Sequence, residues 1–280
     1  MNTINDTKPT PRIPKFYDVI DMLNRPSTDE LGLHRIVEDG RSWWPKLPDK
    51  RVIDLEAVRQ HASKLDQNVP VCIDFEDLYD HNTNSVRPVK MDGRVWTARE
   101  IADDAYVARS LVRAYREGGF RGKIGFYGLL PIREVDWCIL TRDPRYSDQQ
   151  RLWKLACGMA ALAKGLLDEI DFIAPSLYAI GPDVAQHLEW TGANIEQAKA
   201  YGKPVIAYIS PESHWAATGG FARKLLSQPQ WQGTLELIRK KHIDAVIWLG
   251  GDNTFKHDFA ELPMWWECFE ALRTHWNSIK

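Results

Sequence analysis

The sequence predicts an α/β fold, built as a single (β/α)8-type barrel whose ring of strands has room for irregularity. Segments typical of strands and helices alternate from residue 15 to the end of the 280-residue chain. The strand segments are continuous apolar runs without a period of two, which indicates parallel strands buried on both faces. No strand is followed by GxGxxG or by GxxxxGKS/T, so a doubly wound nucleotide-binding sheet is the less favoured alternative.

Six strands are predicted from apolar, β-favouring runs that end at turn residues. They cover residues 15–23, 69–77, 123–131, 171–181, 203–213 and 243–253. Residues 30–55 and 132–146 leave room for a seventh and an eighth strand.

Six further segments have the apolar spacing of amphipathic helices. They cover residues 54–65, 97–119, 147–170, 183–202, 220–242 and 262–279. In the second of these, Thr97 and Glu100 form a capping box at the start. We expect the fourth to break near Gly192 and the fifth to break at Pro229.

The barrel is expected to form one domain over residues 16–280, after a flexible leader at residues 1–15. The leader is polar and rich in Pro, and it lacks the apolar segment of a signal peptide. We therefore expect synthesis in the cytosol. A protein of this kind that acts outside the cell would leave by a non-classical route, such as phage-linked lysis. The longest apolar run, residues 155–167, is too short to span a membrane.

Composition excludes some classes of partner. A net charge of −2 gives no support for binding nucleic acid or an anionic membrane surface. The four cysteines form no CxxC pair, which favours free thiols in a reducing compartment. We expect no cofactor, and the sequence does not indicate an oligomeric state.

The twelve Trp residues fit a Trp-rich core and stacking on sugar rings equally well. Trp265 and Trp266 on the last helix are assigned to the core.

Carboxylates, phenols and one indole stand near the carboxyl ends of the predicted strands, where barrels of this type carry their active groups. The candidates are Asp18, Asp74, Glu76, Asp77, Tyr127, Tyr178, Tyr208, Glu212, Trp248 and Asp252. No Ser, Cys or His nucleophile stands out among the strand ends, which disfavours acyl and phosphoryl transfer. Of the His residues, His214 follows a strand end and is the one expected near the site.

The segment VCIDFED, residues 71–77, ends a buried strand with three carboxylates. Asp74 and Glu76 lie two residues apart on a strand, so both should face the barrel interior while Phe75 faces the helices. Two close carboxylates repel, and the pKa of one should rise towards the range of a general acid at neutral pH. Glycoside hydrolysis uses such a pair. A solvated strand end or a Mg²⁺ or Ca²⁺ site is the alternative.

Five motifs occur in an order that resembles the animal hyaluronidases, a family of irregular-barrel glycoside hydrolases. They are IDFED (73–77), GFYGLLP (125–131), APSLYAIG (174–181), KPVIAYISP (203–211) and DAVIWLGGDN (244–253). The family carries an Asp-aromatic-Glu motif at a strand end, as in IDFED. Each motif is short, and the ordered set is more specific than any member of it.

The resemblance implies retaining, substrate-assisted hydrolysis of a polysaccharide that contains N-acetylhexosamine. Glu76 would be the general acid/base. Asp74 would orient the acetamido group, whose carbonyl oxygen acts as the nucleophile. Tyr178 and Tyr127 would hydrogen-bond that acetamide, and Trp248 would pack against the sugar. The remaining candidates are assigned to substrate binding: Asp18, Asp77, Tyr208, Glu212 and Asp252.

The chain also departs from the family and leaves other functions open. It lacks the signal peptide and the Cys pairing of the secreted enzymes, and the loop after IDFED carries His81, which puts the substrate in question. A retaining glycosidase could instead use Glu212 or Asp252 as an enzyme nucleophile, about 5–5.5 Å from the acid. A barrel could also bind a glycan without cleaving it. A metal-dependent hydrolase based on Asp74, Asp77 and His81 is disfavoured, because catalytic zinc usually takes at least two His.

Overall fold

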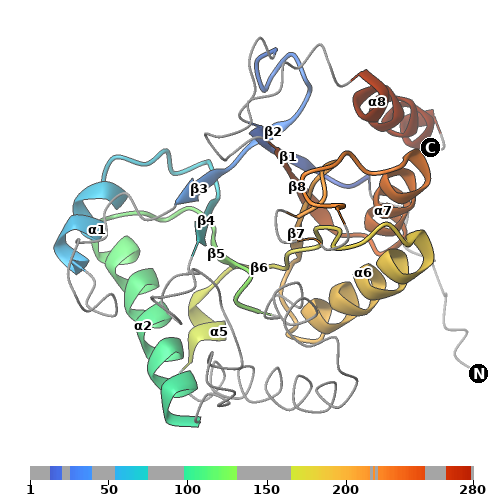
Figure 1. The fold of residues 1–280 in the computed structure, drawn as a ribbon. Helices are drawn as coiled ribbons and strands as arrows, with labels where there is room; N and C mark the ends of the chain where they lie inside the picture. Colours follow the sequence, from blue (N-terminus) through green and yellow to red (C-terminus); the bar gives the residue numbers. More distant parts are fainter. Residues whose placement is uncertain are drawn as a thin grey trace, which may run out of the picture.

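The computed structural model describes residues 13–20, 26–39, 54–74, 98–130, 165–214, 217, 220–249 and 263–278, and the statements below concern these residues. They form a ring of parallel strands with helices on its outside (Figure 1). In the described ranges, no helix is long and apolar enough to cross a membrane. Of the predicted leader, residues 13–15 are described, and the predicted domain limits remain a prediction.

All the strands of the ring run parallel. They are β1 (Phe16–Ile20), β2 (His34–Arg35), β3 (Val37–Asp39), β4 (Val71–Asp74), β5 (Ile124–Tyr127), β6 (Phe172–Ala174), β7 (Ile206–Ile209) and β8 (Asp244–Leu249). They form two sheets, ordered β2-β1-β8-β7 and β3-β4-β5-β6.

The two sheets join at both edges. β2 and β3 are consecutive parts of one extended stretch that is interrupted at Ile36. β6 runs beside β7 through the parallel bridges Ile173–Val205 and Ser176–Tyr208. The strands therefore close into an irregular parallel barrel, which confirms the predicted fold class.

The described helices flank this ring (Figure 1). They are α1 (Leu55–Ala62), α2 (Ala98–Glu117), α5 (Leu166–Glu169), α6 (Val184–Lys199), α7 (Gln228–Lys240) and α8 (Pro263–Ser278). α1 packs on α2 beside β3 and β4, while α6, α7 and α8 pack in succession beside β7 and β8.

Three of the helix predictions need correction. The predicted helix over 147–170 does not run unbroken, because Gly165 has a left-handed φ of 69° directly before α5; residues 147–164 lie outside the described ranges. α6 passes through Gly192 without a break. Pro229 lies in the first turn of α7, where a missing N–H costs no hydrogen bond, so it begins the helix instead of breaking it.

Side chains along the strands alternate between two apolar layers. The interior layer fills the barrel and includes Tyr17, Cys72, Tyr127, Phe172, Tyr208 and Val246. The outer layer lies between the barrel and the helices and includes Phe16, Ile73, Phe126, Ile173, Ala207 and Ile247. Because side chains alternate along a strand, this assignment fixes the direction of the polar residues between them.

Several Trp side chains belong to the outer layer. Trp231, Trp265 and Trp276 are 1%, 2% and 4% exposed. Trp231 Nε1 donates a hydrogen bond to Trp265 O at 3.0 Å, and the two rings meet edge to face. Trp265 is therefore a core residue, as predicted, while Trp248 packs against the interior layer.

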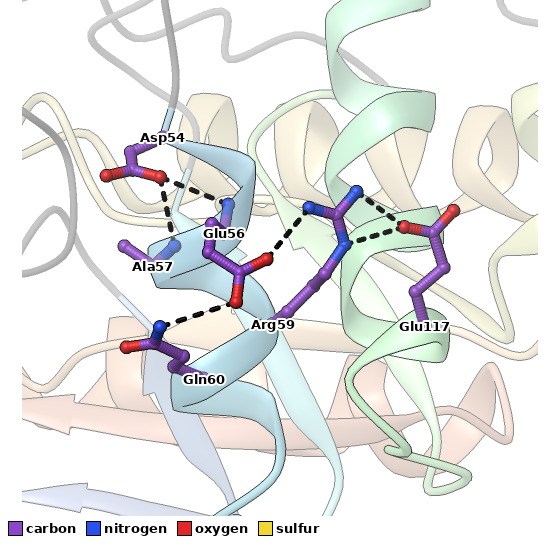
Figure 2. Close-up of polar contacts among 6 residues, drawn as sticks. All are labelled: Asp54, Glu56, Ala57, Arg59, Gln60 and Glu117. Atoms are coloured by element: carbon purple, nitrogen blue, oxygen red, sulfur yellow. Dashed lines mark hydrogen bonds and ion pairs between the residues drawn. The ribbon is translucent and has the colours of Figure 1, made fainter.

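An ion pair between surface side chains links α1 to α2 (Figure 2). Asp54 caps α1 by accepting hydrogen bonds from the N–H groups of Glu56 and Ala57. Arg59 donates to Glu56 in its own helix and to Glu117 at the end of α2. Glu117 is more than half exposed, so this ion pair contributes about 0.2–1 kcal/mol to stability.

Gly125 of β5 marks a close approach inside the barrel. It is in register with Phe172 of β6, and a Cβ added at Gly125 would lie 2.4 Å from the Phe172 ring. Phe172 is 1% exposed and has little room to move. We expect Gly125→Ala to lower the free energy of unfolding by about 1–3 kcal/mol, measured by urea denaturation.

Gly192→Ala is the matched control, because an added Cβ there meets no atom within 4 Å and the residue lies inside α6. This change should leave stability unchanged or raise it by about 0.5–1 kcal/mol. Equal midpoints for the two variants would show that the interior of the barrel is looser than the structure indicates.

Candidate active site

Asp74 and Tyr127 meet at the carboxyl ends of two neighbouring strands. Asp74 is the last residue of β4 and Tyr127 is the last residue of β5, and the two are register partners. Asp74 lies two residues after Cys72 and therefore faces the barrel interior, as predicted from the sequence. The Tyr127 hydroxyl donates to Ser176 Oγ at 3.2 Å. A carboxylate and a phenol thus face the same space.

Aromatic rings from three more strand ends continue this wall. The Tyr127 ring lies 4.6 Å from that of Tyr208 and 6.1 Å from that of Tyr178. The Tyr178 ring lies 5.6 Å from Trp248 and stacks on His214 at 6.1 Å. His214 therefore contacts the wall, as the sequence suggested, and the partly exposed Trp248 gives the wall an accessible ring.

Tyr208 lies deep in the barrel. It is fully buried. Burial is the largest cause, and the neighbouring Cys72 and Glu38 are the next causes, of a hydroxyl pKa well above the usual value. Burial likewise raises the pKa of the Cys72 thiol. Both groups are therefore uncharged at neutral pH. The substrate-binding role predicted for Tyr208 stays a prediction.

Glu38 joins this interior cluster and was missed from the sequence. It sits on β3 opposite Cys72 of β4. Burial, and then the charge of Asp74, raise the pKa of Glu38 to about 8. The one available signal was the room left for a strand between residues 30 and 55, but the strand proved too short and too polar to recognise.

Asp18 has a different environment from Asp74. It lies between Tyr17 and Val19, which both belong to the interior layer, so its side chain faces the outer layer. Its carboxylate accepts hydrogen bonds from Ile20 N and from the Thr28 hydroxyl. These contacts hold the segment that contains Thr28 against β1. The substrate-binding role of Asp18 stays a prediction.

Glu212 follows β7 in a segment that folds beside the end of β6. Glu212 is 4% exposed, and its N–H donates to Ser210 Oγ at 3.0 Å. Two residues later, His214 N donates to Ala179 O at 2.8 Å, which brings the His214 ring onto Tyr178. Glu212 is thus a buried carboxyl group close in sequence to the aromatic wall.

The other predicted site residues lie outside the described ranges: Glu76, Asp77 and Asp252, together with His81 of the disfavoured metal site. Their roles remain predictions from the sequence. The residues that the structure does bring together are Asp74, Tyr127, Tyr178, Tyr208 and Trp248.

No protein-family model and no curated protein matches the chain. Solved structures do match. Bee venom hyaluronidase superposes with a TM-score of 0.58 and 13% identity, over 94% of this chain and 98% of that one. The chain has the barrel fold of that enzyme.

An engineered protein matches with a TM-score of 0.50 and 12% identity, over 88% of this chain and 54% of that one. A double mutant of the Cellulomonas fimi endo-β-1,4-mannanase matches at 0.49 and 12% identity, over 88% of this chain and 55% of that one. At these identities the likeness concerns the fold, a (β/α) barrel of the kind that glycoside hydrolases use.

Proposed function

We propose that the protein is a glycoside hydrolase that cleaves a polysaccharide containing N-acetylhexosamine. One observation carries the proposal: Asp74 faces the barrel interior at the carboxyl end of β4, in register with Tyr127. The Tyr178 and Trp248 rings continue the wall beside them. The barrel fold shared with a hyaluronidase and the ordered motifs of the sequence support the same assignment.

The proposed reaction is retaining and substrate-assisted. The acetamido carbonyl oxygen attacks the anomeric carbon while Glu76 gives its proton to the leaving oxygen, and the glycosidic bond breaks. Asp74 accepts a hydrogen bond from the acetamido N–H and stabilises the positive charge of the cyclic intermediate. Glu76 then takes a proton from water, which attacks the anomeric carbon and reopens the ring with retained configuration.

The aromatic wall has a defined part in this reaction. Tyr127 donates its hydroxyl proton to Ser176, and its oxygen is proposed to accept a hydrogen bond from the substrate. Trp248 is the partly exposed ring of the wall and would pack on the apolar face of a sugar. Tyr178 lies between these two side chains and is proposed to hydrogen-bond the acetamide.

A retaining glycosidase with an enzyme nucleophile is the second candidate. Glu212 favours it, because this buried carboxyl group lies two residues before His214, whose ring stacks on Tyr178. A trapped glycosyl ester on Glu212 after reaction with a 2-fluoro sugar would support this mechanism. A product formed through the acetamido group, without such an ester, would exclude it.

The test of the proposal is hydrolysis of a panel of N-acetylhexosamine polymers and bacterial surface polysaccharides. We expect the wild type to cleave at least one of them and Asp74→Asn to lower kcat by about 10²–10³-fold, because the developing charge loses its partner. Asp168→Asn is the control, since Asp168 is exposed on α5. Glycan binding without cleavage by the wild type, or full activity of Asp74→Asn, would overturn the proposal.

A further inference from the structure

We propose that Glu38 is a positioning residue for Asp74: it keeps its proton inside the barrel and leaves Asp74 as the charged member of the pair. The inference rests on the proposed function, in which Asp74 must accept a hydrogen bond from the acetamido N–H. Glu38 itself is not expected to touch the reacting atoms.

Contacts of its neighbours fix the direction of Glu38. Asp39 points outward, since it accepts a hydrogen bond from the Tyr115 hydroxyl of α2 and its Oδ2 lies 2.7 Å from His61 Nε2 of α1. Val37, on the other side, packs against the outer layer. Because successive side chains of a strand point to opposite faces, Glu38 faces the barrel interior.

The strand register places Glu38 one layer below Asp74. Glu38 is paired with Cys72, and Asp74 is two residues further along the same inward face of β4. Two residues of a parallel strand rise by about 7 Å, a distance that the long Glu side chain largely spans. The charge of Asp74 is, after burial, the second cause of the raised pKa of Glu38, which agrees with this placement.

The surroundings of Glu38 favour its uncharged form. Its Oε2 atom is covered from solvent and has no hydrogen-bond partner among the described residues, although the residue as a whole is partly exposed. Among the described residues, the titratable groups that interact with it are Cys72 and Asp74 from β4 and Tyr208 from β7, and none of these three is a cation. An ionised Glu38 would therefore be a second buried negative charge beside Asp74.

Of the neighbouring side chains on β2, Arg35 is exposed and lies 3.7 Å from Asp29, and His34 is exposed beside Tyr17. Both basic side chains of this strand therefore stand in solvent. The raised pKa of Glu38, about 8, is consistent with this arrangement. At pH 7 Glu38 is mainly protonated, and above pH 8 it ionises.

Stability gives a test that does not depend on catalysis. In the unfolded chain Glu38 ionises near pH 4.5, and in the folded protein near pH 8. Its protonated form therefore supports folding fully below pH 4.5, and this support is lost as the pH rises through 8. Relative to Glu38→Gln, the folded-to-unfolded ratio of the wild type should fall by up to tenfold per pH unit between pH 5 and pH 8.

The measurement is urea unfolding of the wild type, Glu38→Gln and the surface control Glu117→Gln across pH 5–9. A difference between wild type and Glu38→Gln that does not change with pH would overturn the inference. If Glu38→Gln does not fold, Asp74→Asn replaces it. Loss of the Asp74 charge should lower the pKa of Glu38, so the stability loss should end at a lower pH than in the wild type; an unchanged profile would also overturn the inference.

The catalytic readout is the ratio of kcat for Glu38→Gln to kcat for the wild type on whichever glycan is cleaved. This ratio should rise as the pH increases through 8, because the variant cannot place a second charge beside Asp74. A ratio that is flat with pH would refute the positioning role. If no glycan is cleaved while the stability difference changes with pH, the proposed function fails and the protonation of Glu38 stands.

Discussion

Glu76→Gln is expected to lower kcat on the natural polysaccharide by about 10²–10⁴-fold, the usual contribution of a general acid. A sugar alkoxide is a poor leaving group, so bond cleavage requires a proton on the leaving oxygen. Gln keeps the size of the side chain but has no proton to give at neutral pH. Glu76 lies outside the described residues. Its assignment rests on the resemblance of IDFED to the hyaluronidase motif, in which it stands two residues after the inward-facing Asp74.

An aryl glycoside with a nitrophenol leaving group separates general acid catalysis from other losses. This leaving group departs without protonation, so Glu76→Gln should retain far more of its cleavage rate on the aryl substrate than on the polysaccharide. Asp74→Asn should lose both activities, because the proposed partner of Asp74 is the acetamido group. Glu117→Gln, which changes only an exposed ion pair with Arg59, should match the wild type. Equal losses of Glu76→Gln on both substrates would contradict the assignment.

Trp231→Ala is expected to lower the free energy of unfolding by about 3–5 kcal/mol. Trp231 is 1% exposed in the outer layer, with its ring edge-on to Trp265. Truncation leaves a cavity between α7 and α8 and removes the donor that pairs with Trp265 O. Urea denaturation measures the loss. The stability of Trp231→Phe should fall between those of the wild type and Trp231→Ala, because Phe restores part of the ring.

Met264→Ala serves as the control for Trp231→Ala, because Met264 is 45% exposed on α8, the helix against which Trp231 packs. It should change stability by less than about 0.5 kcal/mol. The kcat of the folded Trp231→Ala protein should stay close to that of the wild type, since Trp231 faces the helices instead of the barrel interior. A stable Trp231→Ala variant with weakened glycan binding would mean that this Trp is a sugar platform after all.

The architecture could be predicted because it repeats. Continuous apolar runs alternate with amphipathic segments, and only parallel strands covered on both faces explain both patterns. The inward direction of Asp74 was predicted from the alternation of side chains along a strand, and the place of Cys72 in the interior layer two residues earlier agrees with it. The effects of single Pro and Gly residues were harder to predict. Pro229 lies in the first turn of α7, and α6 continues through Gly192, because the position of such a residue within a helix decides its effect.

Other parts of the site required the three-dimensional register. The sequence indicated that Asp18 and Asp74 both stand near strand ends. Asp18 is instead the third residue of the five-residue β1 and faces the outer layer, and nothing in the spacing of polar residues shows this. Glu38 escaped notice because its strand has three residues and only one of them is apolar. Composition alone could not divide the Trp residues between core and site, since burial depends on which helix face each one occupies.

The central claim is that the carboxyl end of this barrel binds the acetamido group of an N-acetylhexosamine in its cyclised form. Calorimetric titration with a thiazoline mimic of that intermediate tests it most directly, because the mimic presents the bicyclic group without needing the natural polymer. We predict that the wild type and Asp168→Asn bind the thiazoline and that Asp74→Asn loses at least tenfold in affinity. Equal binding by Asp74→Asn and the wild type, or no binding by a wild type that cleaves N-acetylhexosamine polymers, would contradict the account.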